Sequence, residues 1–418
     1  MKELLATLRE EFVDKQHDLE KMLIRDISFE TIANKILVFI GMRRTGKTVF
    51  LFQQILMLIK SNISLSRILY INFEDDRLLA TDHKILVGLV DAFYSLFPEN
   101  HDLHCYLFFD EIQNVPEWPK VIRRLQDTKK VSIYLTGSSA KLLSKEIATS
   151  LRGRSLATEV WPFSYAEYLS IDNIALPTQV IGKKMFDQHY KLLQHYLLWG
   201  GFPEVVAISK TSQRALLQDY VDLVVMRDIV ERHQITNTIL IRYMIKSLLK
   251  NVGVPFSVNK FHNDIKSQGI SSSKNTIYEY LQHIEDAFLL FMVPIYSESI
   301  RKMATNPKKF YAIDPGLVNA YSLSLSPNYG HLFENVFYLD LRRKKHEIYY
   351  YRTQDDFEID FLSRDPEGRL HLWQVAWDVD DKKMLDRERR ALDAAEKELG
   401  IKGQLITPQS YLSGPLNN

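Results

Sequence analysis

The sequence predicts an α/β fold in which a parallel β-sheet, covered by helices, occupies residues 31–164. Three observations lead to this prediction. Short apolar runs alternate with helical patterns, a glycine-containing loop directly follows the first run, and the third run ends in two acidic residues. Strands that alternate with helices along a chain are typical of parallel sheets.

Five apolar stretches have the length and composition of buried strands. They cover residues 36–40, 67–73, 104–110, 131–136 and 155–160. Ahead of them, Met1 to Ile27 carries apolar residues at helical spacing, so residues 1–30 are expected to form a helical lead-in. Pro162 cannot extend a central strand, so the sheet unit is expected to close near residue 164.

The loop after the first predicted strand has the composition of a phosphate-binding loop. It reads Gly41-Met42-Arg43-Arg44-Thr45-Gly46-Lys47-Thr48, and Val49 continues into a predicted helix. The match to G-x-x-x-x-G-K-[ST] lies in the strand–loop–helix setting that this motif requires. Backbone N–H groups and the helix N-terminus would surround a phosphate chain. Lys47 would reach the β- and γ-phosphates, and the Thr48 hydroxyl would ligate Mg²⁺.

Acidic and small polar residues follow two further predicted strands. Asp110 ends the third strand, where an acidic residue holds the water shell of Mg²⁺, and Glu111 is placed to polarise an attacking water as general base. Thr136 and Ser138, at the end of the fourth strand, are candidates for sensing the γ-phosphate. A turn with its own capping serine explains these two residues almost equally well.

Four arginines are candidates for phosphate contacts. Arg154, and after it Arg152, could stabilise transition-state charge in cis or from a neighbouring subunit, although a solvated turn explains them equally well. Arg43 and Arg44 lie inside the loop itself. They are expected either to contact phosphate or to pair with acids such as Asp110 or Glu111.

Composition limits the remaining possibilities. The net charge of +1 gives no global field toward nucleic acid or membrane, and the single cysteine, Cys105, excludes an internal disulfide and a cysteine-based metal cluster. The first residues are charged and lack a signal-peptide core. The longest apolar stretch, Ala287 to Ile295, is too short to span a bilayer. We therefore expect a cytoplasmic protein without membrane contact.

Together these motifs resemble the predicted prokaryotic ATPases of the AAA+ superfamily that fuse an ATPase core to a winged-helix region and a C-terminal nuclease-like domain. The resemblance also includes Leu151-Arg152-Gly153-Arg154, Pro162-Phe163-Ser164-Tyr165-Ala166-Glu167-Tyr168, Gly200-Gly201-Phe202-Pro203-Glu204 and Glu358-Ile359-Asp360-Phe361. It implies ATP rather than GTP as the nucleotide, with Mg²⁺. The family usually has proline where Met42 stands, at a position that points away from the phosphates.

On this resemblance the chain divides into five parts. They are the lead-in at 1–30, an AAA+ P-loop ATPase core at 31–164, a helical lid at 165–235, a winged-helix-like region at 236–325 and a degenerate PD-(D/E)XK nuclease-like domain at 326–418. The sequence leaves the client protein and the oligomeric state open, and a homo-oligomer is one possibility.

The region 256–310 has the pattern of helix, turn and helix, with Gly269 in the turn. Polar residues at the start of the second helix would face a DNA major groove, namely Ser272, Ser273, Lys274, Asn275 and Tyr278. Basic residues that could touch phosphates follow, namely Arg301, Lys302, Lys308 and Lys309. The alternative is a helical module that packs on the ATPase core, since Glu279, Glu285 and Asp286 lie on or near the same helix.

The C-terminal part resembles a nuclease fold that holds Mg²⁺ on a helix glutamate and on strand carboxylates, with a lysine assisting the attacking water. Glu334 and Asp360 fit the first two positions. Gln374 and Ala376 replace the third carboxylate and the lysine. The expectation is a nuclease fold without nuclease activity.

Two functions remain from this reasoning. The first is an enzyme that hydrolyses ATP with Mg²⁺ and couples turnover to movement of its C-terminal modules. The second is a nucleotide-gated module that binds DNA or protein with little turnover. Glu111 favours the first function, because a protein that only binds nucleotide needs no general base.

Overall fold

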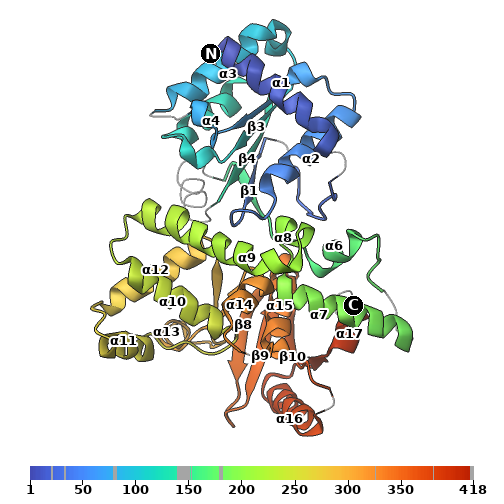
Figure 1. Cartoon of the computed structure of the whole chain (residues 1–418), viewed down its shortest axis with the longest axis vertical. Helices are drawn as coiled ribbons and strands as arrows, with labels where there is room; N and C mark the ends of the chain where they lie inside the picture. Colours follow the sequence, from blue (N-terminus) through green and yellow to red (C-terminus); the bar gives the residue numbers. More distant parts are fainter. Residues whose placement is uncertain are drawn as a thin grey trace. The chain divides into compact units, whose positions relative to one another are not determined.

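The computed structural model contains two compact units, Met1–Trp161 and Pro162–Asn418 (Figure 1). It describes residues 1–19, 22–32, 34–78, 82–138, 151, 153–177, 182–324, 326–379 and 381–414. Within these ranges, no helix combines the length and the apolar character needed to cross a bilayer.

The first unit is built on a parallel sheet of five strands, as the sequence predicted. The strands are β1 (Ile36–Ile40), β2 (Ile68–Asn72), β3 (Cys105–Asp110), β4 (Val131–Gly137) and β5 (Ser155–Glu159), in the spatial order β2-β3-β4-β1-β5. All four neighbouring pairs are parallel. The predicted α/β class is confirmed, and the order places β4 between the two strands that precede the candidate loop and acids.

Helices cover this sheet. They are α1 (Lys2–Leu19), α2 (Lys47–Lys60), α3 (Lys84–Leu96) and α4 (Trp118–Thr128) (Figure 1). One buried cluster joins α1, α2 and the strands, and in it the rings of Phe39 and Phe50 meet edge to face at 4.9 Å. Phe12 of α1 packs on Phe52 at 5.5 Å. Burial of these aromatic rings fixes α2, and with it the loop that precedes α2, against the sheet.

The lead-in differs in part from its prediction. α1 ends at Leu19, and residues 22–32, which were expected to continue the helical pattern to Ile27, have no helical structure. Contacts with the rest of the unit hold this segment instead. The backbone N–H of Arg25 donates to the side chain of Gln53 at 3.1 Å, and Gln53 donates to the carbonyl of Leu23 at 2.7 Å.

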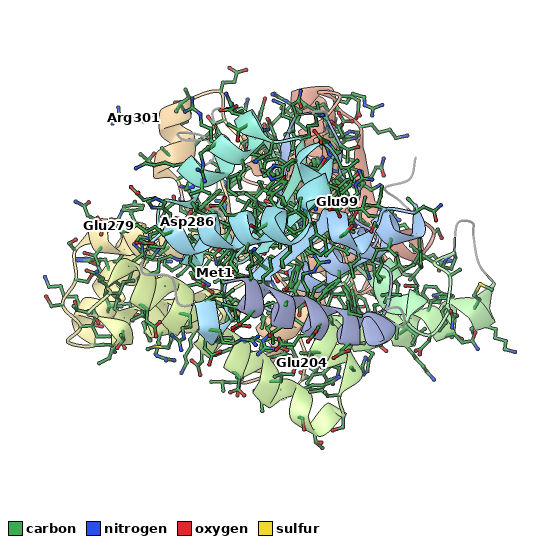
Figure 2. The ribbon with its side chains drawn as sticks, turned by 90° about the horizontal axis from the view of Figure 1, so that it is seen from above. Met1, Glu99, Glu204, Glu279, Asp286 and Arg301 are labelled. Carbon is green, nitrogen blue, oxygen red and sulfur yellow. The ribbon has the colours of Figure 1, made fainter. Side chains whose placement is uncertain are left out.

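The second unit starts with helices. They are α6 (Tyr165–Ser170), α7 (Lys183–Trp199), α8 (Pro203–Ala207), α9 (Lys210–Val224), a π-helical turn (Val225–Glu231), α10 (Thr238–Lys250), α11 (Val258–Ser267) and α12 (Lys274–Asp286). An antiparallel pair follows, β6 (Leu290–Val293) with β7 (Lys309–Ala312), and α13 (Ile300–Thr305) lies between the two strands in sequence. Arg301 of α13 and Glu279 of α12 lie at the surface (Figure 2).

A small α/β region completes this unit. Its elements are α14 (Pro315–Tyr321), α15 (Tyr329–Arg343), β8 (Glu347–Arg352), β9 (Glu358–Arg364), β10 (Leu370–Val375), α16 (Lys382–Leu399), β11 (Gly403–Ile406) and α17 (Pro408–Leu412). The sheet order is β11-β10-β9-β8, with β10 and β11 parallel and the other pairs antiparallel. The predicted helical and small α/β regions are therefore present.

The Gly200-Gly201 motif has a structural role in this unit. Gly200 has φ 75°, and a Cβ on it would meet the Asp314 carboxylate at 1.7 Å. The N–H of Gly201 donates to the same carboxylate at 2.7 Å. Only glycine combines this backbone conformation with such a close approach.

Candidate functional site

The site lies at the carboxyl ends of β1, β3 and β4. Because these strands are parallel neighbours, the loop after β1, the acids after β3 and the polar residues after β4 meet at one edge of the sheet. The sequence-predicted residues of the loop, Asp110, Glu111, Thr136 and Ser138 are thereby brought together.

The conformation of the loop explains its glycines. A Cβ on Gly41 would meet the carbonyl oxygen of Val160 at 2.2 Å, and Gly46 has φ 92° ahead of α2. Thr45 donates its hydroxyl to the carbonyl of Met42 at 3.0 Å, and the Met42 side chain is fully buried. The loop is thus fixed from inside, and the N-terminus of α2 faces the site with its unpaired N–H groups.

Lys47 is held by neutral and charged partners. Its Nζ donates to the carbonyls of Gly41 at 3.0 Å and Met42 at 3.2 Å, and lies 3.3 Å from Oε1 of Glu111. Burial would raise the pKa of Glu111, but the charge of Lys47 and a hydrogen bond from Gln113 outweigh it and lower that pKa below its usual value. Glu111 is therefore ionised and paired with the cation of the loop.

Asp110 is fully buried among hydroxyl donors. Its Oδ2 accepts from Thr48 at 2.6 Å and from Tyr70 at 3.1 Å, and its Oδ1 accepts from Thr136. Burial, followed by the charge of Glu111, raises the pKa of Asp110. A divalent cation beside Thr48 and Asp110 would offset that burial, and both groups are the hard oxygen ligands that Mg²⁺ prefers.

Thr136 links the two acidic residues. Besides donating to Asp110, its hydroxyl oxygen accepts from the backbone N–H of Glu111 at 2.9 Å. Glu111 has φ 51°, so the backbone turns sharply where β3 ends. Ser138 contributes less directly, since its hydroxyl accepts from Gln113 at 3.4 Å. The structure places Thr136 against both acids, whereas Ser138 contacts Gln113, the residue that binds Glu111.

The arginines of the loop are partly accounted for. Arg43 pairs with Glu74, an acid that the sequence did not single out, and its charge also helps to lower the pKa of Glu111. Arg44 has φ 70° and an exposed side chain. Both residues remain within the phosphate loop, so phosphate contact by either stays a prediction.

Arg154 lies at the far end of the sheet from the loop. Its carbonyl accepts from Ile36, the first residue of β1, at 2.8 Å, and its guanidinium pairs with Asp127. The five residues of β1, at about 3.3 Å each, put the phosphate loop about 16 Å away. Of the two alternatives for Arg154, action within its own chain does not fit this position. Arg152 lies outside the described residues.

Arg25 supports the loop and was missed by sequence reasoning. Its guanidinium is buried and donates to the carbonyl of Thr45 at 2.8 Å and to that of Trp161 at 2.7 Å. No motif marks this residue, because its partners lie 20 and 136 positions away along the chain. Tyr70 was missed for the same reason.

A second cluster of acids lies in the C-terminal α/β region, around a buried lysine. Nζ of Lys309 lies 3.2 Å from Glu334, 2.9 Å from Glu358 and 3.4 Å from Asp360. Tyr311 also donates to Glu334 at 2.6 Å. Lys309 is 1% exposed, so the prediction that it contacts DNA phosphates is wrong.

The surroundings of this cluster are also polar. Gln374 accepts from the backbone N–H of Asp360 at 3.1 Å and donates to Glu388 at 2.5 Å, while Ala376 is buried. A cavity of about 630 Å³ adjoins the carboxylates. Within the described ranges, no group of three or more His, Cys, Asp or Glu residues is arranged to hold a metal ion.

Comparison with protein families gives three matches along the chain. A model described as an AAA domain matches residues 33–169. Two models described as domains of unknown function match residues 190–328 (DUF8612) and 329–410 (DUF4143). The first match confirms the AAA+ prediction for the unit that contains the phosphate loop.

Two relatives cover most of the chain. An uncharacterized protein of Methanocaldococcus jannaschii is 37% identical over 390 residues, which is 91% of this chain and 83% of that protein. An uncharacterized protein of Haemophilus influenzae is 30% identical over 345 residues, 82% of this chain and 83% of that protein.

Among solved structures, the Walker-type ATPase PABY2304 of Pyrococcus abyssi has a TM-score of 0.44 and 14% identity, over 75% of this chain and 95% of that one. The Aeropyrum pernix ORC1 protein, solved in complex with DNA, has a TM-score of 0.30 and 12% identity, over 76% and 91%.

Proposed function

The chain belongs to the AAA-domain family of these archaeal and bacterial relatives, and from this premise we propose that it hydrolyses ATP with Mg²⁺. Turnover would drive a conformational change of the C-terminal modules. The observation that carries the proposal is the pairing of loop residues with the acids after β3, Thr48 with Asp110 at 2.6 Å and Lys47 with Glu111 at 3.3 Å. A P-loop ATPase needs these four groups within reach of one another.

The residues present fit a nucleotide with its metal. Gly46 and the start of α2 supply N–H groups for a phosphate chain. Thr48 and Asp110 would hold Mg²⁺, which supplies neutralisation of the charge on the phosphates when bound. Asp110 has two further hydroxyl partners, Tyr70 and Thr136, so its carboxylate keeps its orientation.

Lys47 and Glu111 would change partners during the cycle. Lys47 contacts two neutral carbonyls besides Glu111, so phosphate oxygens can attract its ammonium away from that carboxylate. Glu111 would then be free to accept a proton from water. Gln113 and the sharp turn at Glu111 would keep the carboxylate at the mouth of the site.

A steady-state phosphate-release assay on the full chain tests this proposal. Lys47→Ala removes the cation that faces the phosphates, and we expect ATP binding to fall below detection. Lys120→Ala is a matched control, since Lys120 also pairs with a glutamate, Glu117 at 2.6 Å, but is exposed. Wild-type protein that binds ATP without releasing phosphate would favour the nucleotide-gated module instead.

Arg154 would act only on a neighbouring subunit. If the protein assembles and Arg154 contributes in trans, mixing Arg154→Ala with Lys47→Ala protein should restore part of the activity. Each mutant then supplies the group that the other lacks. Subunits that co-assemble without restored activity would remove Arg154 from the catalytic residues.

We also propose that the 236–325 region is winged-helix-like and contacts nucleic acid. Three helices, α10 to α12, precede the antiparallel pair β6 and β7, and Ser273 caps α12 by accepting from Thr276 at 3.1 Å. Arg301 and Lys302 are exposed on α13. We propose further that residues 165–235 form a lid and that residues 326–418 form a nuclease-like domain. We also propose a cytoplasmic location.

A further inference from the structure

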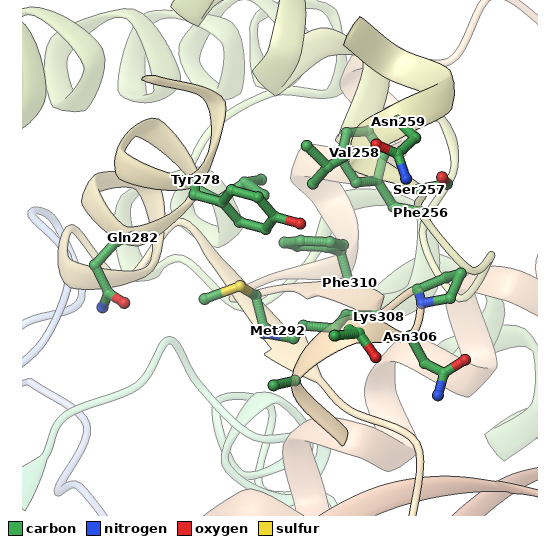
Figure 3. A pocket seen from close by; sticks show the side chains of 14 residues that line it. Phe256, Ser257, Val258, Asn259, Tyr278, Gln282, Met292, Asn306, Lys308 and Phe310 are labelled. Carbon is green, nitrogen blue, oxygen red and sulfur yellow. The ribbon is translucent and has the colours of Figure 1, made fainter. Parts of the chain in front are cut away.

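A cavity of about 280 Å³ lies in the region of α11, α12, β6 and β7 (Figure 3). Its walls come from four separate segments between Phe256 and Phe310. They are the start of α11, the middle of α12, β6 and the stretch from the end of α13 into β7. This volume lies just below the range of about 300–1,000 Å³ that is usual for pockets of drug-sized ligands. It suits one ring system rather than a large ligand.

The apolar part of the cavity is aromatic and suited to a flat group. Phe310 is buried at its base, and Phe256 meets the Phe310 ring at 5.5 Å and 81°. Tyr278 forms the opposite wall from α12, and its hydroxyl points into the cavity (Figure 3). Tyr278 is 50% exposed, so one side of its ring is open to a ligand. Met292 adds a polarisable side wall.

The polar part of the cavity has unused hydrogen-bonding capacity. In the described part of the chain, no hydrogen bond engages the side-chain amide of Asn259, the hydroxyl of Tyr278 or the ammonium of Lys308, and all three residues line the cavity. The amide of Gln282 is engaged with Asp286 at 3.0 Å and lies on the other side of Tyr278 from Asn259 (Figure 3). Donors and acceptors thus surround an aromatic slot, as recognition of the edge of a base requires.

Charge narrows the choice of ligand. None of the residues described as lining the cavity is acidic, and Lys308 is basic. Arg301 and Lys302 lie on α13, the helix whose last residues, Ala304 and Thr305, also line the cavity. A ligand that carries a flat ring and a phosphate backbone matches both features, because the ring can enter the slot while basic side chains meet the phosphates.

We propose that this cavity binds an unpaired nucleobase of a single-stranded nucleic acid, stacked on Tyr278 with its edge toward Asn259. The proposal rests on the nucleic-acid contact proposed for the 236–325 region. It adds a ligand class to that contact, because a base inside the cavity cannot be paired in a duplex.

The test uses the full chain and single-stranded oligonucleotides in which one adenine is replaced by fluorescent 2-aminopurine, in a DNA and an RNA arm. Binding at low salt is followed by anisotropy of a terminal label, and stacking by quenching of 2-aminopurine. We expect Tyr278→Ala to weaken binding about tenfold and to abolish the quenching. Tyr278→Phe, which keeps the ring and loses only the hydroxyl, should retain the quenching and most of the affinity. Ile239→Ala, which removes another exposed apolar side chain on α10, is the control.

The possible outcomes distinguish the base pocket from the nucleic-acid contact on which it rests. An oligonucleotide that binds wild type and Tyr278→Ala equally, with the same quenching, overturns the base pocket and leaves the nucleic-acid contact in place. Absence of binding to wild type in both arms at low salt overturns the contact and the pocket together. Neither outcome affects ATP turnover, which is measured on the same samples.

Discussion

Two buried lysines define the two polar centres of this chain, and their partners differ in kind. Lys47 opens α2 and contacts two neutral carbonyls and one carboxylate. Lys309, at the start of β7, contacts three carboxylates, from α15 and β9. The charge of Lys309 is already balanced, whereas Lys47 keeps capacity for anions that arrive from outside.

The two sites also differ in the source of the positive charge that balances their acids. Burial alone would lower the pKa of Lys309, but the charges of Glu334, Asp360 and Glu358 outweigh it and hold that pKa above its usual value. Lys309 therefore remains a fixed cation beside the acids where a nuclease fold would hold a metal. At the phosphate loop, the corresponding cation is expected to come with the nucleotide. A lysine enclosed by carboxylates stabilises the fold, and one held by carbonyls can take part in a cycle.

The largest expected effect is at Glu111. Glu111→Gln keeps the size of the side chain and removes the proton acceptor, so steady-state ATP turnover should fall by about 10²–10⁴-fold while ATP binding persists. Turnover is measured by phosphate release and binding by titration with a fluorescent ATP analogue. Turnover within twofold of wild type would make Glu111 a partner of Lys47 only, and the functional contrast between the two lysines would fail.

Lys309→Met should affect stability instead of turnover. Methionine matches the length of the apolar stem but leaves Glu334, Glu358 and Asp360 without their cation. Removing one partner of a buried ion pair costs about 3–5 kcal/mol, which denaturant titration of the second unit would detect. Lys308→Met, at the neighbouring and more exposed position, is the control. A stable Lys309→Met protein would show that the cluster contributes little to folding.

The phosphate loop and the Lys309 cluster differ in how far their contacts could be predicted from the sequence. The phosphate loop, Asp110 and Glu111 could be predicted because each directly follows a predicted strand, and parallel strands bring their carboxyl ends together. The strand positions could also be predicted, because each strand is a short run of apolar residues. Lys309 was assigned to DNA because its partners lie 25 and 51 residues away and belong to elements whose packing no local pattern encodes.

The position of Arg154 could have been predicted from the sequence. A residue directly before a strand lies at the amino end of that strand, while the phosphate loop lies at a carboxyl end. The prediction that left action in cis open used proximity in sequence and neglected strand direction. The end of α1 at Leu19 was less accessible, since contacts of Arg25 and Gln53 compete with the helical pattern.

The pKa of Asp360 gives a further test of how the Lys309 cluster contributes to stability. Burial, followed by the charge of Glu334, raises the pKa of Asp360 to about 7. In the unfolded chain the pKa of an aspartate is about 3.9, so between about pH 4 and 7 the folded state holds a proton that the unfolded state has lost. The free energy of unfolding should therefore decrease as the pH rises through this window.

The difference between two variants isolates that effect. Asp360→Asn should remove this part of the pH slope, as measured by denaturant titration between pH 4.5 and 7.5, while Asp356→Asn on the neighbouring exposed turn should keep it. Equal slopes for wild type and Asp360→Asn would mean that Lys309 keeps Asp360 ionised throughout the range.

The smallest expected effect comes from loosening the support of Lys47 without touching the lysine. Arg25→Gln removes the guanidinium that joins the carbonyls of Thr45 and Trp161, so the phosphate loop loses one of its anchors. We expect KM for ATP to rise severalfold, on the order of 1 kcal/mol, with kcat changed less, because one charged hydrogen-bond donor is lost.

Arg9→Gln is a close control. Arg9 lies on α1, away from the loop, and also joins two carbonyls, those of Ile68 at 2.8 Å and Leu65 at 3.0 Å. A loss of stability shared by both variants, with KM unchanged, would give Arg25 a purely structural role. A rise in KM confined to Arg25→Gln would show that Lys47 depends on the loop around it, as a lysine held mainly by backbone carbonyls must.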